Sequence, residues 1–126
     1  MPTNLRVIHH SDFLRARPDG QVDLDMAQRA LAEIARAADG LGDFHLLVDI
    51  RNLSGSLTPA ELHELAGSLQ PYGETFMRKT AVLCPRERFD HARFFALLAA
   101  SHGFTRIRAF LSYEDAMEWV LLPPRD

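Results

Sequence analysis

The sequence has a single cysteine, Cys84, and no long run of apolar residues. One cysteine cannot form a disulfide within the chain, which is typical of proteins in a reducing cytoplasm. The longest stretch without a formal charge, Phe94 to Thr105, has 12 residues, fewer than the ~18–20 that cross a bilayer. Met1 to Arg6 lacks the basic start and apolar core of a secretory signal. We therefore expect a cytoplasmic protein without a membrane span.

Lysine is nearly absent as well, since 13 of the 14 basic residues are arginine, and the net charge is −3. A negative net charge argues against non-specific nucleic-acid binding. Positive charge is concentrated in residues 78–108, which hold seven basic and two acidic side chains, a net of +5. This segment could bind an anion through bidentate arginines, or it could form an ordinary solvated helix face.

Motifs for phosphate and metal chemistry are also missing. Gly40-Leu41-Gly42 precedes a predicted strand, whereas a phosphate-binding loop follows one. The six histidines have no metal-ligand spacing, because His9 and His10 are adjacent and the other four are scattered. The sequence predicts no metal site, no cofactor and no catalytic constellation.

Cys84 has the only plausible nucleophilic setting. It follows a predicted strand and precedes a predicted helix, near Arg86 and Arg88, and both features can lower a thiol pKa. A phosphatase loop would need an arginine six residues later, where this chain has Asp90. The simpler interpretation is a small apolar residue that ends a buried strand, so we rank a Cys84-dependent enzyme last.

The order of the elements is more informative than any motif. Three apolar strand patterns are each followed by an amphipathic helix pattern, which predicts a largely parallel sheet. These strands cover residues 45–50, 80–83 and 106–110. At 126 residues the chain is long enough for one domain.

Two short strands, Leu5 to Ile8 and Phe13 to Arg17, are expected to form an N-terminal hairpin around the polar break His9 to Asp12. A helix is predicted from Asp23 to Gly40. The fold class is therefore a single-domain α/β mixed sheet of about four or five strands: the hairpin, then parallel strands, covered by about four helices.

The helix after the first of the three strand patterns has the clearest start signal. Thr58 is the predicted cap, Pro59 occupies the first helical position and Glu61 can reach back to the cap. The next helix, from Pro85 to Gly103, is apolar around much of its circumference. Phe94 and Leu98 are left over from its inward face and could form a homodimer interface.

Ligands of open α/β sheets bind beyond the carboxyl ends of the strands. We therefore expect a ligand or partner rim at Asp49, Arg51, Ser54, Ser56, Arg86, Arg88 and Tyr113. Asp49 and Arg51 could orient a ligand there, or Asp49 could simply accept hydrogen bonds from the backbone of the following loop.

The element order and two segments resemble the SpoIIAA-like and STAS domains of bacteria. "HLLVDIRNLSG" (45–55) is similar to the family strand that ends in an acidic residue, and "IRAFLSYEDAMEWV" (107–120) to its closing strand and helix. The resemblance covers about residues 4–122, and so a single domain over residues 1–126.

The resemblance implies a non-enzymatic module. SpoIIAA-like relatives are proposed to bind small or lipid-like molecules, and STAS relatives act as phosphorylation-switched partners of regulatory kinases, as anti-sigma factor antagonists do. The switching serine lies near the start of the helix that follows the acidic strand, which makes Ser56 the candidate phosphosite here. The expected partner is an unknown protein or a small apolar or anionic ligand, and a homodimer is the alternative.

Overall fold

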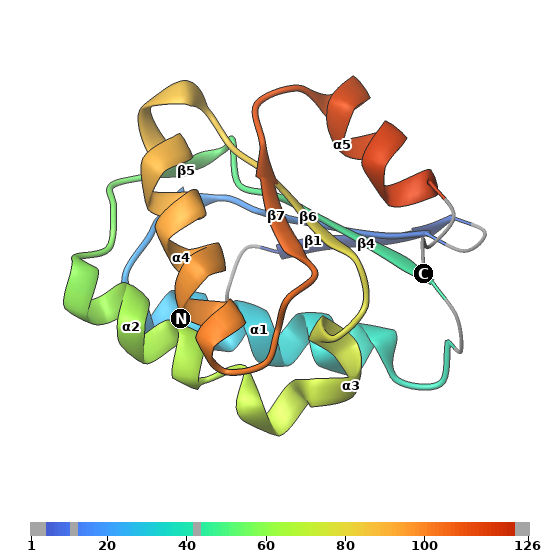
Figure 1. Cartoon of the computed structure of the whole chain (residues 1–126), viewed down its shortest axis with the longest axis horizontal. Coiled ribbons are helices and arrows are strands. Elements are labelled where there is room, and N and C mark those ends of the chain that lie inside the picture. The colour runs from blue at the N-terminus through green and yellow to red at the C-terminus, as the bar shows by residue number, and fades with distance from the viewer. Residues whose placement is uncertain (1–4, 11–12, 42–43, 123–126) are drawn as a thin grey trace.

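The computed structural model describes residues 5–10, 13–41 and 44–122. Its main sheet has five strands in the order β1-β2-β4-β6-β7 (Figure 1). β1 runs antiparallel to β2, and the four strands β2, β4, β6 and β7 are mutually parallel. The strands are β1 Leu5–His10, β2 Phe13–Pro18, β4 His45–Asp49, β6 Thr80–Leu83 and β7 Ile107–Phe110.

The predicted mixed α/β sheet is thus confirmed for its parallel part. The predicted break at His9 is wrong, since β1 continues to His10, and residues 11–12 between β1 and β2 lie outside the described residues. A second, two-stranded parallel sheet was not predicted; it pairs β3 (Gly20–Gln21) with β5 (Leu53–Ser54). Such short pairings leave almost no periodic signal in a sequence.

The described residues form five α-helices, one more than expected. The extra helix, α3, is a single turn in a segment where the sequence predicts only a helix end, and it follows the 3-10 turn Gln70–Tyr72. The helices are α1 Leu24–Ala38, α2 Pro59–Gly67, α3 Gly73–Phe76, α4 Phe89–Ser101 and α5 Tyr113–Leu121. α1, α4 and α5 pack on the main sheet, and α2 packs on α1 and α4. A second 3-10 turn, Arg86–Arg88, leads into α4.

The sheet separates two cores. On one face, α1 and α4 enclose a cluster that includes Ile34, Leu46 and Phe104. On the other face, α5 packs against Leu47 and Leu83 (Figure 1). Alternate residues of a strand point to opposite faces, so β4, β6 and β7 contribute to both cores, whereas β2 contributes Leu14 and Ala16 to the first core only.

The start of α2 has the predicted capping box. The Glu61 backbone N–H donates to Thr58 Oγ1 at 3.1 Å, and the Thr58 backbone N–H donates to Glu61 Oε1 at 2.9 Å. Two helix-end donors are satisfied reciprocally in this way. The cap fixes where α2 begins, shortly after β5.

Candidate functional site

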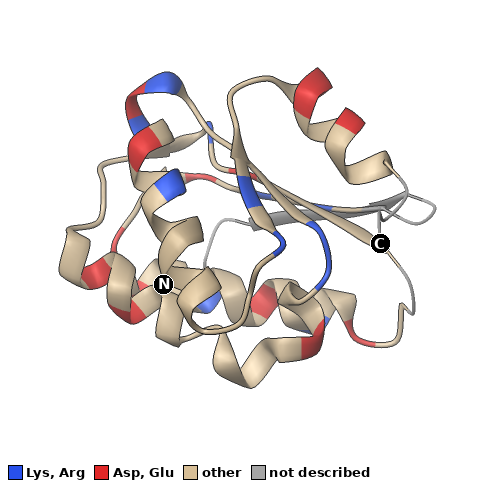
Figure 2. Ribbon diagram, in the orientation of Figure 1, with Lys and Arg blue, Asp and Glu red and all other residues tan. Residues whose placement is uncertain are grey.

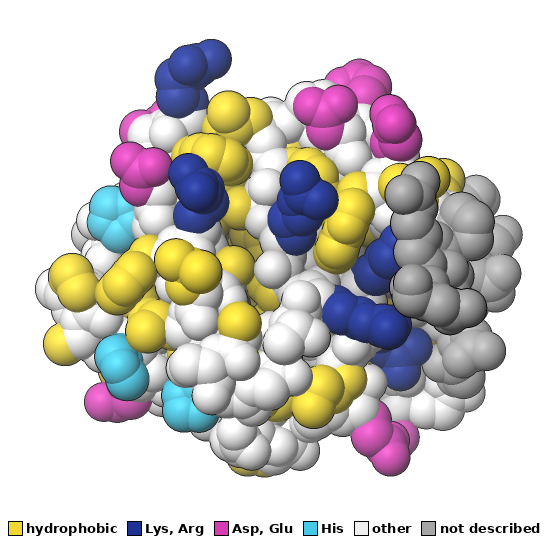
Figure 3. All heavy atoms as spheres, in the orientation of Figure 1, with side chains coloured by type: hydrophobic (Ala, Val, Ile, Leu, Met, Phe, Trp, Pro, Cys, Tyr) yellow, Lys and Arg dark blue, Asp and Glu magenta, His cyan; other side chains and the backbone are white. Residues whose placement is uncertain are grey.

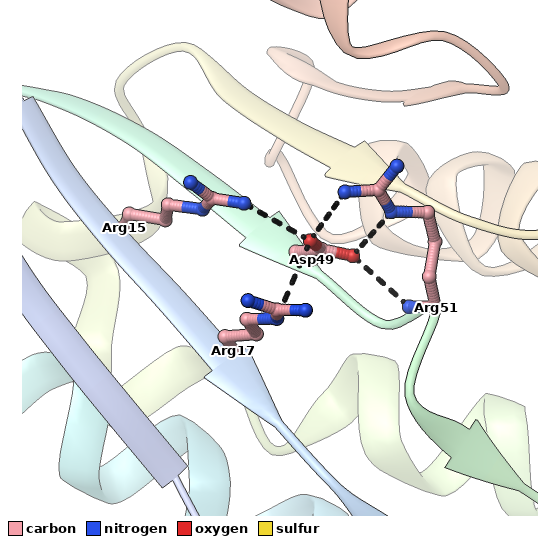
Figure 4. Close-up of polar contacts among 4 residues, drawn as sticks. All are labelled: Arg15, Arg17, Asp49 and Arg51. Carbon is pink, nitrogen blue, oxygen red and sulfur yellow. Dashed lines mark hydrogen bonds and ion pairs between the residues drawn. The ribbon is translucent and has the colours of Figure 1, made fainter.

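A buried carboxylate lies at the carboxyl end of β4. Asp49 is 0% exposed, and three guanidinium groups converge on it (Figure 4). Oδ2 of Asp49 lies 2.9 Å from Arg51 Nη2, 3.4 Å from Arg15 Nη2 and 3.8 Å from Arg17 Nε. Asp49 Oδ1 accepts from the Nε of Arg51 at 3.0 Å and from its backbone N–H at 3.1 Å. We call Arg15, Arg17 and Arg51 the arginine cluster.

Strand register brings these groups together. β2 lies parallel to β4 with Arg15 beside Leu47 and Ala16 beside Val48. Arg15 and Arg17 alternate with buried residues, so both project to the same face as Asp49. Arg51 follows Asp49 by two residues and reaches back from the loop. The contact to its backbone N–H confirms that Asp49 also serves the turn, as one of the two interpretations of the sequence predicts.

The surroundings keep Asp49 ionised. Burial acts to raise its pKa, but the side-chain and backbone hydrogen bonds from Arg51, its charge, and the hydrogen bond from Arg15 outweigh that effect, so the pKa of Asp49 lies below its ordinary value. The hydrogen bond to Asp49 in turn raises the pKa of Arg51. The carboxylate thus holds the arginine cluster in place.

The N-terminus of α5 lies beside the arginine cluster. The guanidinium carbon of Arg15 is 5.5 Å from the centre of the Tyr113 ring, a cation–π contact. The Glu114 carboxylate accepts from the Ser112 hydroxyl at 2.8 Å. Its pKa is lowered by its own backbone N–H, by Ser112 and by the charge of Arg51. The first residues of α5 therefore interact electrostatically with the arginine cluster.

An apolar cavity of about 160 Å³ lies on the opposite face of the sheet, between the strands and helices α1, α2 and α4. Its wall is almost entirely aliphatic and aromatic, with side chains such as Ala30, Val48 and Phe95. Ser56, Arg88 and His91 also line it. Arg88 Nη1 is buried and has no hydrogen-bond partner among the described residues. A buried donor without an acceptor destabilises the fold, so this part of the cavity wall is where a ligand acceptor would be most favourable.

The structure divides the predicted rim between the two faces of the sheet. Asp49, Arg51 and Tyr113 belong to the arginine cluster side, whereas Ser56 and Arg88 line the cavity. Ser54 and Arg86 belong to neither group. Ser54 lies in the small sheet, where its hydroxyl donates to the Gly20 carbonyl at 3.5 Å, and Arg86 is exposed.

Sequence reasoning missed Arg15 and Arg17. Their signal was present in Phe13-Leu14-Arg15-Ala16-Arg17, where arginines alternate with small and apolar residues on a strand. Only the pairing of this strand with β4 brings the arginines to Asp49, and sequence patterns do not specify which strands become neighbours.

The basic segment 78–108 reaches both ends of the sheet. Lys79 precedes β6 and Arg106 precedes β7, so both lie at the amino ends of the strands, whereas Arg86 and Arg88 follow the carboxyl end of β6 (Figure 2). Arg93 and Arg108, both exposed, lie on α4 and β7. Of these arginines, Arg88 is the one that lines the cavity.

Cys84 is buried at 1% exposure, and its thiol donates to the Phe110 carbonyl at 3.4 Å. Burial raises the pKa of the thiol to about 11. A protonated, inaccessible thiol is a poor nucleophile. These properties favour the interpretation of Cys84 as a small apolar residue at the end of a buried strand.

We expect Cys84 to resist an aromatic disulfide reagent at pH 8 in the native protein and to react fully after denaturation. At that pH the thiol is below its raised pKa of about 11 and shielded by the sheet. Absorbance of the released thiolate measures the reaction. Rapid native labelling at pH 8 would contradict this assignment and would reopen the enzyme hypothesis.

The apolar surface of α4 differs in one residue from the prediction. Phe94 is 39% exposed, as expected, but Leu98 packs against the cluster formed by α2 residues and is half-buried. Leu97, which is 70% exposed, takes its place beside Phe94. Hydrophobic side chains gather over α2 and α4 on the face seen in Figure 3. The difference arises because α4 packs on α2 as well as on the sheet, which widens its buried arc.

Among the described residues, no three His, Cys, Asp or Glu side chains gather in an arrangement that could hold a metal ion. In that same part of the chain, none of the helices has both the length and the apolar character that crossing a bilayer requires.

Two solved structures resemble this one over nearly their whole length. An uncharacterized protein of the DUF3478 family with a SpoIIAA-like fold, from Shewanella loihica PV-4, aligns over 94% of this chain and 93% of its own, with 18% identity and a TM-score of 0.56. An anti-sigma factor antagonist from Mycobacterium paratuberculosis aligns over 94% of both chains, with 18% identity and a TM-score of 0.60. No protein-family model matches the sequence, and neither does any curated protein.

Proposed function

From its SpoIIAA-like fold and the cavity beneath its sheet, we propose that this chain is a non-enzymatic binding module for a small apolar molecule that carries an anionic group. The observation that carries the proposal is an apolar cavity of about 160 Å³ with a buried, unpaired arginine nitrogen in its wall. Apolar pockets with few, well-placed polar groups are typical ligand sites.

The volume limits the size of the ligand. An apolar cavity of ~150 Å³ stays dry and accommodates a molecule the size of benzene. A cavity of about 160 Å³ therefore suits a short or compact apolar body, and a longer chain would have to extend through the mouth.

Arg88 selects the ligand's polar end. A carboxylate at Arg88 Nη1 would supply the acceptor that this buried donor lacks. The hydroxyl of Ser56, also in the cavity wall, offers a second polar contact. The apolar body would then lie against Val48 and Phe95, away from solvent.

Binding without turnover is supported by the chemistry of the cavity wall. Its ionisable side chains among the described residues are Arg88 and His91, and no carboxylate lines it to pair with His91. In catalytic triads a carboxylate orients the histidine that acts as the general base. Cys84 does not line the cavity and is held protonated.

The test is calorimetric titration with octanoate and with octanol, which share a chain and differ in charge. We expect octanoate to bind wild-type protein, and Arg88→Met to weaken octanoate by about tenfold while leaving octanol nearly unchanged, because one charged hydrogen bond is lost. Arg86→Met is the matched control, since Arg86 is exposed beside the cavity but does not line it. Failure of both ligands to bind, or equal losses in both variants, would overturn the proposal.

A homodimeric protein-interaction domain is the second candidate, favoured by the exposure of Phe94 and Leu97 one turn apart on α4. If it is correct, light scattering at low micromolar concentration gives twice the monomer mass for wild type and the monomer mass for Phe94→Glu. Phe94→Tyr keeps the ring and should keep the dimer. A wild-type monomer excludes this candidate.

A switched form of either function would act through Ser56. This serine is exposed, precedes the Thr58 cap by two residues and lies in the wall of the cavity. A phosphate there would add negative charge at the start of α2 and close to the proposed ligand. Intact-mass spectrometry of natively purified protein tests for it, and a consistently unmodified chain counts against the switch.

A further inference from the structure

The arginine cluster carries more positive charge than its carboxylate neutralises. Three guanidinium groups lie within 4.0 Å of Asp49, which supplies one negative charge. Among the described residues, Glu114 is the other acidic side chain whose charge interacts with the group, through Arg51. One positive charge remains when both acids are counted, and two remain at the carboxylate itself.

In the described part of the chain, many N–H donors of the arginine cluster also lack an acceptor. Each guanidinium has five N–H donors, whereas Asp49 accepts one side-chain hydrogen bond from Arg15 and two from Arg51. Arg15 Nε is buried and has no acceptor among the described residues. With the Asn52 amide turned so that its oxygen faces Arg17, that oxygen takes up two donors of Arg17 at 3.1 Å.

The site is accessible from solvent and is approached by a helix N-terminus. The side chains of Arg17 and Arg51 are 41% and 42% exposed, whereas Asp49 beneath them is covered. Tyr113, the first residue of α5, lies against Arg15. The N-terminal end of a helix carries partial positive charge, which favours an anion at the same place.

We propose that the arginine cluster binds a phosphate-type oxyanion, on the face of the sheet opposite the cavity. Guanidinium forks arriving from two strand positions and a loop can each contact a different edge of a tetrahedral anion (Figure 4). Asp49 serves as a positioning residue that holds the arginines side by side. A planar carboxylate ligand would use fewer of these directions.

The negative charge of Glu114 should oppose the binding of an anion. Its carboxylate is ionised and lies close enough to Arg51 for their charges to interact. An incoming anion therefore meets repulsion from Glu114, and Glu114→Gln should tighten phosphate binding. Glu118→Gln, on the same helix one turn away, removes an equal charge and should have a smaller effect.

The experiment is a nuclear magnetic resonance titration of isotope-labelled protein with inorganic phosphate at pH 7, at constant ionic strength set with chloride. We expect saturable shifts of the arginine side-chain Nε–H signals of Arg15 and Arg51 and of the Tyr113 amide. Arg17→Gln should weaken phosphate by about tenfold, because a charged hydrogen bond is lost. Arg86→Gln, with the same change of charge, should bind as wild type does.

The source of the anion is distinguished by a second titration with glycerol phosphate. Tighter binding than inorganic phosphate indicates the phosphoryl group of a larger molecule, and equal binding indicates free phosphate; both support the site. Shifts that do not saturate, equal affinities of Arg17→Gln and wild type, or tighter binding of an oligoglutamate peptide would overturn it. The reporting residues lie away from Arg88, so this result is independent of octanoate binding.

Discussion

Replacing Asp49 with alanine is expected to lower the free energy of unfolding by about 3 kcal/mol, the largest effect of any single change in this site. Asp49 is fully buried and accepts hydrogen bonds from Arg15, from the Arg51 side chain and from the Arg51 backbone. Its loss leaves three adjacent positive groups without their counter-charge. Partial exposure of the arginines allows water to solvate them, which keeps the loss at the lower end for a broken buried ion pair.

Urea unfolding followed by circular dichroism measures this loss. Asp49→Asn should cost nearly as much as Asp49→Ala, because the amide NH₂ would face guanidinium donors. The matched control is Asp25→Asn, which breaks an exposed ion pair with Arg29 one turn along α1 and should cost about 0.5 kcal/mol or less. Equal losses at Asp49 and Asp25 would show that the buried carboxylate is not a structural centre.

The stability lost on replacing Asp49 with asparagine should depend on pH. The pKa of Asp49 in the folded protein lies below its ordinary value of 3.8. The stability it contributes is therefore fully present above that ordinary value and is lost as pH falls through the lower folded pKa. Wild type and Asp49→Asn should differ by a constant amount near neutral pH and converge in strong acid. A difference that persists unchanged into strong acid would contradict the proposed ionisation.

Filling the cavity with Ala30→Leu should abolish octanoate binding, a loss of well over tenfold. Ala30 is buried on α1 and lines the cavity, so a leucine there would occupy space that the ligand needs. We expect the free energy of unfolding to be unchanged or to rise by about 1 kcal/mol, because new apolar contacts replace empty volume.

Calorimetric titration and thermal unfolding together separate binding from stability. Ala100→Leu is the control, since it makes the same change at an exposed position of α4 outside the cavity. This control should bind octanoate as wild type does. If Ala30→Leu is stably folded and still binds octanoate fully, the ligand lies elsewhere.

Local signals determined much of the fold. Thr58, Pro59 and Glu61 specify the start of α2 by hydrogen bonds within one turn, so their pattern is sufficient without tertiary contacts. Alternation of strand and helix patterns likewise determined the parallel sheet, and the acidic residue that ends β4 marked the edge where the arginine cluster lies.

Tertiary structure decided which residues meet. Arg15 and Arg17 reach Asp49 because β2 pairs with β4, a choice among strands that lie about thirty residues apart in sequence. The predicted rim divides into two sites because Val48 and Asp49 point to opposite faces of the sheet. The cavity needs three helices packed at once, and packing on α2 covers Leu98 in part while leaving Leu97 exposed. Local periodicity encodes each element, but neighbours and faces follow from how the elements share one core.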